Sequence, residues 1–272
     1  MTDPISTRAF EADGPVDIAL TIGAGSIDVR LVDEPGVNIT VRHAPDNASP
    51  LVDGLANLMS WVSGHLGEEG QVDAPAEAVR QTTVEFGAGR LVVRSPQALP
   101  LRGVPLSVVV TAPAGSNVVA RAGNAPVTVT GDAGRVEATA VGTIRVATAA
   151  GVKLRSGGGD VESAVVTGSS SVHTGGGNVW LGTVSGDMMV RTGTGNVTVA
   201  DATAGQLELT SGSGDLRVGV RAGSAAEVDL SSGSGTARSE LPLTHDKPST
   251  APGLRVRGRT GSGTALIGLA KV

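Results

Sequence analysis

The sequence predicts an all-β fold: a single-stack β-solenoid of coils about 18 residues long, with a short helical insertion. Three observations support this prediction. Glycine-marked strands recur along the chain, apolar residues alternate within them, and the composition favours small and β-branched side chains. Because repeats add stacked units rather than separate cores, we expect one domain over residues 1–272.

The repeat is visible as short strands that follow glycine turns, as in SGGGDVES, TGTGNVTV and SGSGDLRV. The last glycines of successive units lie 19, 17, 18, 18, 19, 21 and 28 residues apart. They are Gly123, Gly142, Gly159, Gly177, Gly195, Gly214, Gly235 and Gly263. A second glycine-marked strand lies midway between most of them, which predicts two strands and two turns in each coil.

Alternation within the strands predicts which side chains face the core. Val179 and Leu181 point to one side and Trp180 to the other, and the same pattern recurs in the neighbouring units. The chain has two Phe, two Trp and no Tyr. Small aliphatic side chains must therefore fill a narrow core, and a stacking platform for sugars or bases is not expected.

The exception to the repeat is an expected helical insertion at residues 44–81. Apolar residues at about 49–67 follow a helical period, which predicts an amphipathic helix that either caps the solenoid or contacts a partner. We expect residues 68–81 to form a polar return and residues 240–253, with three prolines, to form a surface loop. The partner-contact candidates are Leu51, Leu55, Leu58, Met59, Trp61, Val62, Leu66 and Trp180.

Charge and cysteine content exclude several classes of function. The formal net charge of -5 argues against nucleic acid as a partner, because such binding depends on neutralising phosphates. The absence of cysteine excludes disulfides and thiolate sites. We expect no integral membrane segment and no signal peptide, and hence a cytoplasmic protein, with envelope association as the alternative.

The glycine turns carry oxygen ligands that invite comparison with calcium-binding repeats. Asp160 is followed at equivalent positions by Asn178, Asn196 and Asp215, so neutral amides interrupt the charge that calcium requires. We therefore predict a structural ladder of turn side chains, no metal and no cofactor.

Two groups of outward residues could carry chemistry. Glu208 and Asp229 are expected on adjacent coils, but without a deep cleft we interpret them as surface charge and predict no enzyme. Arg155, His173 and Arg191 occupy one outward position in three successive coils and are candidates for binding an anion. The alternative is a ladder bridged by neighbouring carboxylates.

The motifs GAGSIDVR, GAGRLVVRS, SGGGDVES, TGTGNVTV and SGSGDLRV resemble those of the bacterial putative-adhesin family of β-strand-repeat proteins, a domain of unknown function common in actinobacteria. The resemblance covers nearly the whole chain except about 44–81. It implies a stacked β-solenoid of the kind found in envelope or surface-associated proteins, and it brings no catalytic residues.

These observations predict a non-enzymatic structural or protein-interaction module, either a self-associating scaffold or an envelope-associated adhesin-like protein. The expected partner is another protein or a second copy of the chain. The alternative is a binding protein or enzyme that acts on an anionic polysaccharide through Arg155, His173 and Arg191.

Overall fold

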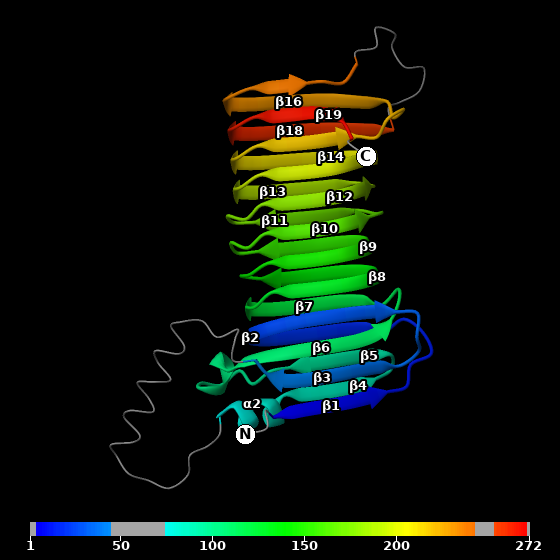
Figure 1. Cartoon of the computed structure of the whole chain (residues 1–272), viewed down its shortest axis with the longest axis vertical. Coiled ribbons are helices and arrows are strands. Elements are labelled where there is room, and N and C mark those ends of the chain that lie inside the picture. The colour runs from blue at the N-terminus through cyan, green and yellow to red at the C-terminus, as the bar shows by residue number, and fades with distance from the viewer. Residues whose placement is uncertain (1–3, 45–73, 243–252, 271–272) are drawn as a thin grey trace, which may run out of the picture.

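The computed structural model describes residues 4–44, 74–242 and 253–270, which form one sheet of 19 strands around an apolar core (Figure 1). The strands are β1 (Ile5–Phe10), β2 (Asp17–Val32), β3 (Val37–His43), β4 (Thr83–Gly87), β5 (Arg90–Arg94), β6 (Pro105–Pro113), β7 (Asn117–Asn124), β8 (Val127–Ala140), β9 (Ile144–Ser156), β10 (Val161–Val166), β11 (Ser170–Thr174), β12 (Val179–Ser185), β13 (Met188–Thr194), β14 (Val197–Ser213), β15 (Leu216–Val220), β16 (Ala226–Ser234), β17 (Ala237–Ser239), β18 (Leu254–Ser262) and β19 (Ala265–Leu269). The helix α2 (Ala74–Gln81) and the 3-10 helix η2 (Leu101–Gly103) accompany them.

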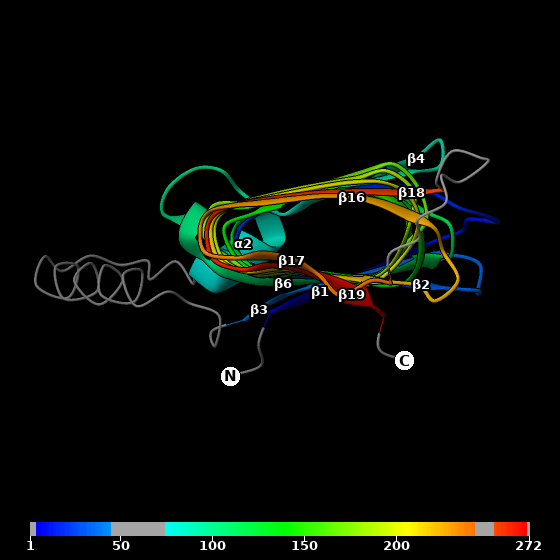
Figure 2. The same cartoon turned by 90° about the horizontal axis from the view of Figure 1, so that it is seen from above.

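The sheet has two flattened faces joined by tight bends, as the view along the stack shows (Figure 2). Face 1 contains, in spatial order, β4, β5, the first half of β2, β7, the second halves of β8 and β9, β11, β13, the second half of β14, β18 and β16. Face 2 contains, in spatial order, β1, β3, β6, the second half of β2, the first halves of β8 and β9, β10, β12, the first half of β14, β15, β19 and β17.

The pairing shows that the prediction of a plain single-stack β-solenoid is wrong. Strands β9, β10, β12, β14, β13 and β11 pair in a closed ring, every pair parallel, so the core is a six-stranded parallel barrel with extra strands and a helix. The ring closes because β9 and β14 continue unbroken through a bend and pair on both faces. In β9, Ala149–Gly151 supply small residues at the bend, where the sequence suggested a break.

The spatial order of the strands also departs from chain order at both ends. Strand β2, near the start of the chain, lies between β5 and β7 on one face and between β6 and β8 on the other. Strands β18 and β19, at the end of the chain, lie between β14–β15 and β16–β17 (Figure 1). Antiparallel pairs β1–β3, β3–β6 and β4–β5 complete the N-terminal end.

The predicted alternation and repeat register are confirmed within this different architecture. Val161 pairs with Val179, and Val179 pairs with Val197, so neighbouring strands are offset by one repeat of 18 residues. All three side chains are buried. Val228 and Leu230 alternate in the same way but are only half-buried, because β16 is the outermost strand at this end of face 1. The inward side chains of β16 are therefore less buried than those of the strands further inside the stack.

The predicted insertion is only partly visible. Its expected amphipathic helix, with Leu51, Leu55, Leu58, Met59, Trp61, Val62 and Leu66, lies outside the described residues, as do residues 243–252 of the expected loop. The polar return predicted at 68–81 is wrong at 74–81, where α2 forms and buries Ala78 and Val79. Two buried apolar side chains anchor this short helix on the core despite its polar composition.

Candidate functional site

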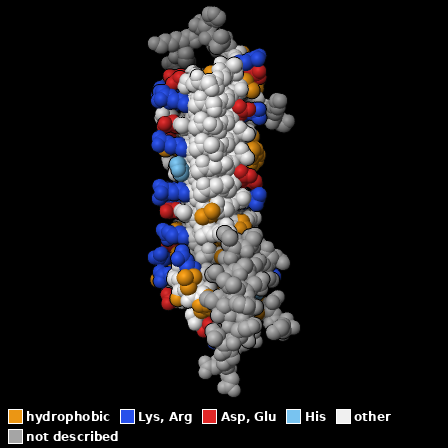
Figure 3. All heavy atoms as spheres, turned by 90° about the vertical axis from the view of Figure 1, so that its left-hand side faces the viewer, with side chains coloured by type: hydrophobic (Ala, Val, Ile, Leu, Met, Phe, Trp, Pro, Cys, Tyr) orange, Lys and Arg blue, Asp and Glu red, His pale blue; other side chains and the backbone are white. Residues whose placement is uncertain are grey.

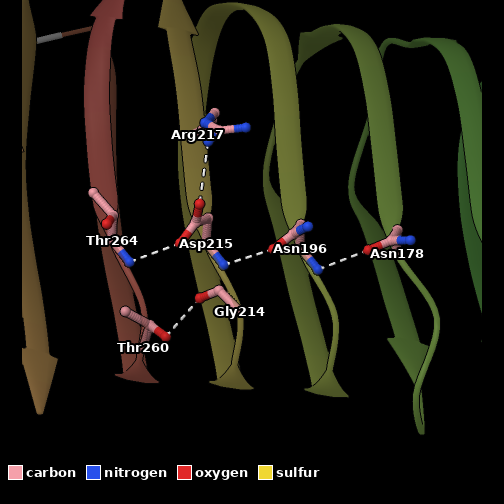
Figure 4. Close-up of polar contacts among 7 residues, drawn as sticks. All are labelled: Asn178, Asn196, Gly214, Asp215, Arg217, Thr260 and Thr264. Carbon is pink, nitrogen blue, oxygen red and sulfur yellow. Dashed lines mark hydrogen bonds and ion pairs between the residues drawn. The ribbon is translucent and has the colours of Figure 1, made fainter. Parts of the chain in front are cut away.

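The turn residues Asp160, Asn178, Asn196, Asp215 and Thr264 form a hydrogen-bonded ladder, part of which is drawn in Figure 4. The backbone N–H groups of Asn178, Asn196 and Asp215 donate to the Oδ1 atom of the preceding rung at 2.8, 3.0 and 2.8 Å. The side-chain oxygens that calcium would need thus bind backbone amides. In the described ranges, no three acidic or histidine side chains cluster as metal ligands. The ladder is a structural feature of the turns.

A second ladder of buried hydroxyl groups lies beside the first and was missed in the sequence. Ser156, Ser211 and Thr260 donate to the carbonyl oxygens of Gly142, Gly195 and Gly214 at 3.0, 3.0 and 2.8 Å. Each buried hydroxyl satisfies a turn carbonyl of the neighbouring coil. The signal that could have revealed it is a Ser or Thr three residues before the turn glycine in successive units.

The predicted column of Arg155, His173 and Arg191 is confirmed as a spatial register. His173 on β11 pairs with Arg155 on β9 and with Arg191 on β13, and all three side chains are exposed. They line a shallow hollow of about 320 Å³ together with Ser171 and Met189. The hollow forms over β11 because Ser171 and His173 are shorter than the side chains of the strands on either side. We call this site the cation hollow.

The cations of the hollow have few acidic partners. Arg155 and His173 make no ion pair with any residue of the described ranges, and Arg191 reaches Glu208 at 3.9 Å. Several other arginines are paired. Arg145 lies 3.0 Å from Glu162, and the hydrogen bonds that Arg30 and Arg221 donate to Asp28 and Asp201 raise the pKa values of these two arginines. Direct carboxylate contacts of the kind expected in the predicted alternative are thus present at Arg191 but not at Arg155 or His173 within the described residues.

The column of Arg155, His173 and Arg191 continues beyond the hollow along face 1. It runs onto strands whose position in the sheet the sequence did not predict. Thr139 pairs with Arg155, Arg121 with Thr139, Thr21 with Arg121, and Arg94 with Thr21. In the other direction, Arg191 pairs with Thr210 and Thr210 with Arg259. We call Arg94, Arg121, Arg155, His173, Arg191 and Arg259 the cation row. Figure 3 shows Lys and Arg side chains, with a histidine among them, along one edge beside a strip of uncharged turn residues.

The expected stacking of Glu208 on Asp229 is wrong, because Arg257 of the inserted β18 lies between them. Arg257 forms an ion pair with Asp229 at 3.2 Å. The two carboxylates are thus two strands apart and separated by a cation. They do not form the close pair that a retaining glycosidase requires.

Trp180 occupies the position expected for it on face 2, between Glu162 and Thr198. Its side chain is 45% exposed. The other partner-contact candidates lie outside the described residues, so the structure does not bring them together with Trp180. Of the helices that the structure describes, none is long and apolar enough to cross a membrane.

Comparison with known proteins identifies a family and a fold. A family model described as Toastrack DUF4097 matches residues 108–261, more than half of the chain. A putative adhesin from Bacteroides fragilis is 13% identical, with 97% of this chain and 96% of that chain covered and a TM-score of 0.53. A putative lipid binding protein from Parabacteroides distasonis is 11% identical, with coverage of 98% and 95% and a TM-score of 0.47. No curated protein matches the chain.

Proposed function

Because this chain belongs to the Toastrack DUF4097 family, we propose that it is a non-enzymatic, adhesin-like binding protein that attaches to an anionic partner. One observation carries the proposal: the cation hollow presents Arg155, His173 and Arg191 side by side on an exposed face. Guanidinium groups bind carboxylates through two parallel hydrogen bonds. Two neighbouring arginines therefore suit an anionic ligand, since Arg155 has no ion pair in the described residues and Arg191 has one of 3.9 Å. The actinobacterial type, envelope association and self-association stay predictions.

Binding fits the geometry better than catalysis does. The hollow is shallow and open, and the described residues that line it include no carboxylate pair of the kind that sugar hydrolysis needs. A ligand held there would keep one side in water, which suits attachment rather than bond cleavage. The structural neighbour from Bacteroides fragilis is named a putative adhesin, which agrees with this proposal.

A second candidate function, contact with a protein partner, is favoured by Trp180. Its ring is 45% exposed on the face opposite the cation hollow, and exposed tryptophan is frequent at the centre of protein interfaces. The two candidates use different faces and can be tested separately.

The first test measures binding of a hyaluronan tetrasaccharide by calorimetry at low salt. We expect Arg155→Ser/Arg191→Ser to bind about tenfold or more weakly, because two charge-assisted hydrogen-bonding groups are lost. The matched control is Arg145→Ser/Arg217→Ser on face 2, which removes the same charge and should bind as the wild type does. Equal losses in both variants, or no binding by the wild type, would contradict the proposal.

A further inference from the structure

The cation row has a regular chemical repeat that extends far beyond the hollow. Arginines occupy every second strand of face 1, in the order Arg94, Arg121, Arg155, Arg191 and Arg259. Since neighbouring strands are about 4.8 Å apart, the guanidinium groups recur every 9.6 Å or so along the row. Eight strand spacings separate Arg94 from Arg259, a distance of about 38 Å.

The positions between the arginines carry hydroxyl groups or histidine, and none carries an acid. Thr21, Thr139 and Thr210 alternate with the arginines, and their hydroxyls make no side-chain hydrogen bond to another residue in the described ranges. The row therefore offers an alternation of cation and neutral hydrogen-bonding group. This alternation suits a ligand in which charged and uncharged units also alternate.

Acidic side chains beside the row are largely neutralised by other cations. Glu137 lies 3.4 Å from Lys153, and Asp229 lies 3.2 Å from Arg257. By contrast, Arg94, Arg121 and Arg259 form no ion pair within the described part of the chain. A chain with net charge -5 thus keeps a row of positive charge on one face, in which only Arg191 forms an ion pair within the described residues. Such a local field attracts a polyanion more strongly than the net charge suggests.

The strip on the other side of the row consists of glycines beside His173 and Arg191, whereas Val141, further along it, is exposed. Gly175 and Gly193 follow His173 and Arg191 by two residues, and a Cβ atom at either would lie 2.2 or 2.4 Å from a carbonyl oxygen of the neighbouring coil. These positions must stay glycine for the turns to pack. An extended polymer can therefore lie against the bare backbone beside the arginines.

We propose that the cation row binds a linear acidic polysaccharide with a carboxylate on every second sugar, aligned along face 1 from Arg94 to Arg259. This inference rests on the proposed function and extends it from the hollow to the whole row. The arginine repeat of about 9.6 Å is close to the length of an extended disaccharide. Each carboxylate can accept two hydrogen bonds from one arginine, and the threonines can bind sugar hydroxyls.

Nucleic acid fits the row less well. Its phosphates recur about every 3.4 Å along a strand, well below the spacing of the arginines. Binding of single strands also uses aromatic rings for stacking, and along the cation row the described residues include none. Recognition by charge and hydroxyl groups needs no rings, which agrees with the scarcity of aromatic residues in this chain.

The experiment compares hyaluronan fragments of increasing length, up to one that spans Arg94 to Arg259. The affinity of the wild-type protein for hyaluronan should rise with fragment length. The rise should exceed the statistical increase that comes from more binding positions on a longer fragment, because additional arginines engage the same chain. The variant Arg94→Ser/Arg121→Ser/Arg259→Ser should lose most of this gain, about tenfold or more, yet bind the tetrasaccharide normally. The control Arg30→Ser/Arg145→Ser/Arg217→Ser on face 2 should keep the gain.

The outcomes separate the two proposals. If the tetrasaccharide binds at the hollow but longer fragments gain nothing, or if the distal variant keeps the full gain, the polymer inference is wrong and the proposed function stands. If neither fragment binds the wild type, both fall. Tighter binding of polygalacturonate, with a carboxylate on every sugar, or of an oligo-dT strand would contradict the inferred alternation of charged and neutral units. Circular dichroism checks that each variant is folded.

Discussion

At the residue scale, the turns depend on hydroxyl and amide groups that satisfy backbone atoms of the next coil. Ser211 is buried and donates to the carbonyl oxygen of Gly195 at 3.0 Å. Ser163 is equally buried in the core, but its Oγ atom has no hydrogen-bond partner within the described residues. Ser211 lies three residues before the turn glycine Gly214, whereas Ser163 lies within a strand and has no such glycine after it.

This contrast predicts opposite effects for the same substitution. Ser163→Ala should leave the free energy of unfolding unchanged or raise it, because a buried unpaired hydroxyl is removed. Ser211→Ala should lower it by about 1–3 kcal/mol, because the Gly195 carbonyl loses its side-chain donor in a buried position. Chemical denaturation of the two variants and the wild type measures both. A loss of stability in Ser163→Ala similar to that in Ser211→Ala would show that Ser163 has a partner.

At the scale of the strands, the sequence predicted those parts of the fold in which chain order and spatial order agree. Arg155, His173 and Arg191 are each 18 residues apart on strands that pair directly, so their register could be read from the repeat. Arg94 and Arg259 belong to the same row but were missed. Arg94 joins the row through β2 and Arg259 lies on β18, and both of these strands are inserted out of chain order. Local periodicity contains no information about such insertions.

The insertion of β18 also determines which apolar residues matter most for stability. Leu209 on β14 is fully buried, whereas Leu230 on the outermost strand β16 is half-buried. We expect Leu209→Ala to lower the free energy of unfolding by about 2–5 kcal/mol and Leu230→Ala to lower it by clearly less, since its site can relax toward solvent. Thermal unfolding of the two variants tests this order. Equal shifts in Tm would indicate that β16 is covered in solution.

For the whole molecule, the closed ring of β9, β10, β12, β14, β13 and β11 should be the most stable unit. Every strand of the ring has a partner on both sides, while β16 and β17 each pair on one side only. In arrays of stacked units, stability depends on the interfaces between neighbours, so the ends open first. The sequence could not predict the ring, because Ala149–Gly151 has the composition of a turn and yet continues β9.

Hydrogen exchange measured by mass spectrometry can check this ranking. Amides of β11 and β12 should exchange most slowly, and those of the outer strands β16 and β17 should exchange faster, because their opening costs less free energy. Strands β18 and β19, although last in the chain, should be protected more than β16 and β17. Faster exchange in β18 than in β16 would contradict the spatial order described above.

The position of β18 and β19 has a consequence for synthesis on the ribosome. Strands β16 and β17 are translated first, but their neighbours β18 and β19 come last in the chain. Until β18 and β19 emerge, β14 and β15 present an open edge, and β16 and β17 lack their final neighbours. The coil that contains β16 and β17 can therefore be completed only after β18 and β19 have been translated, and a message truncated just before Leu254 would release a chain whose β14 and β15 edge stays unpaired.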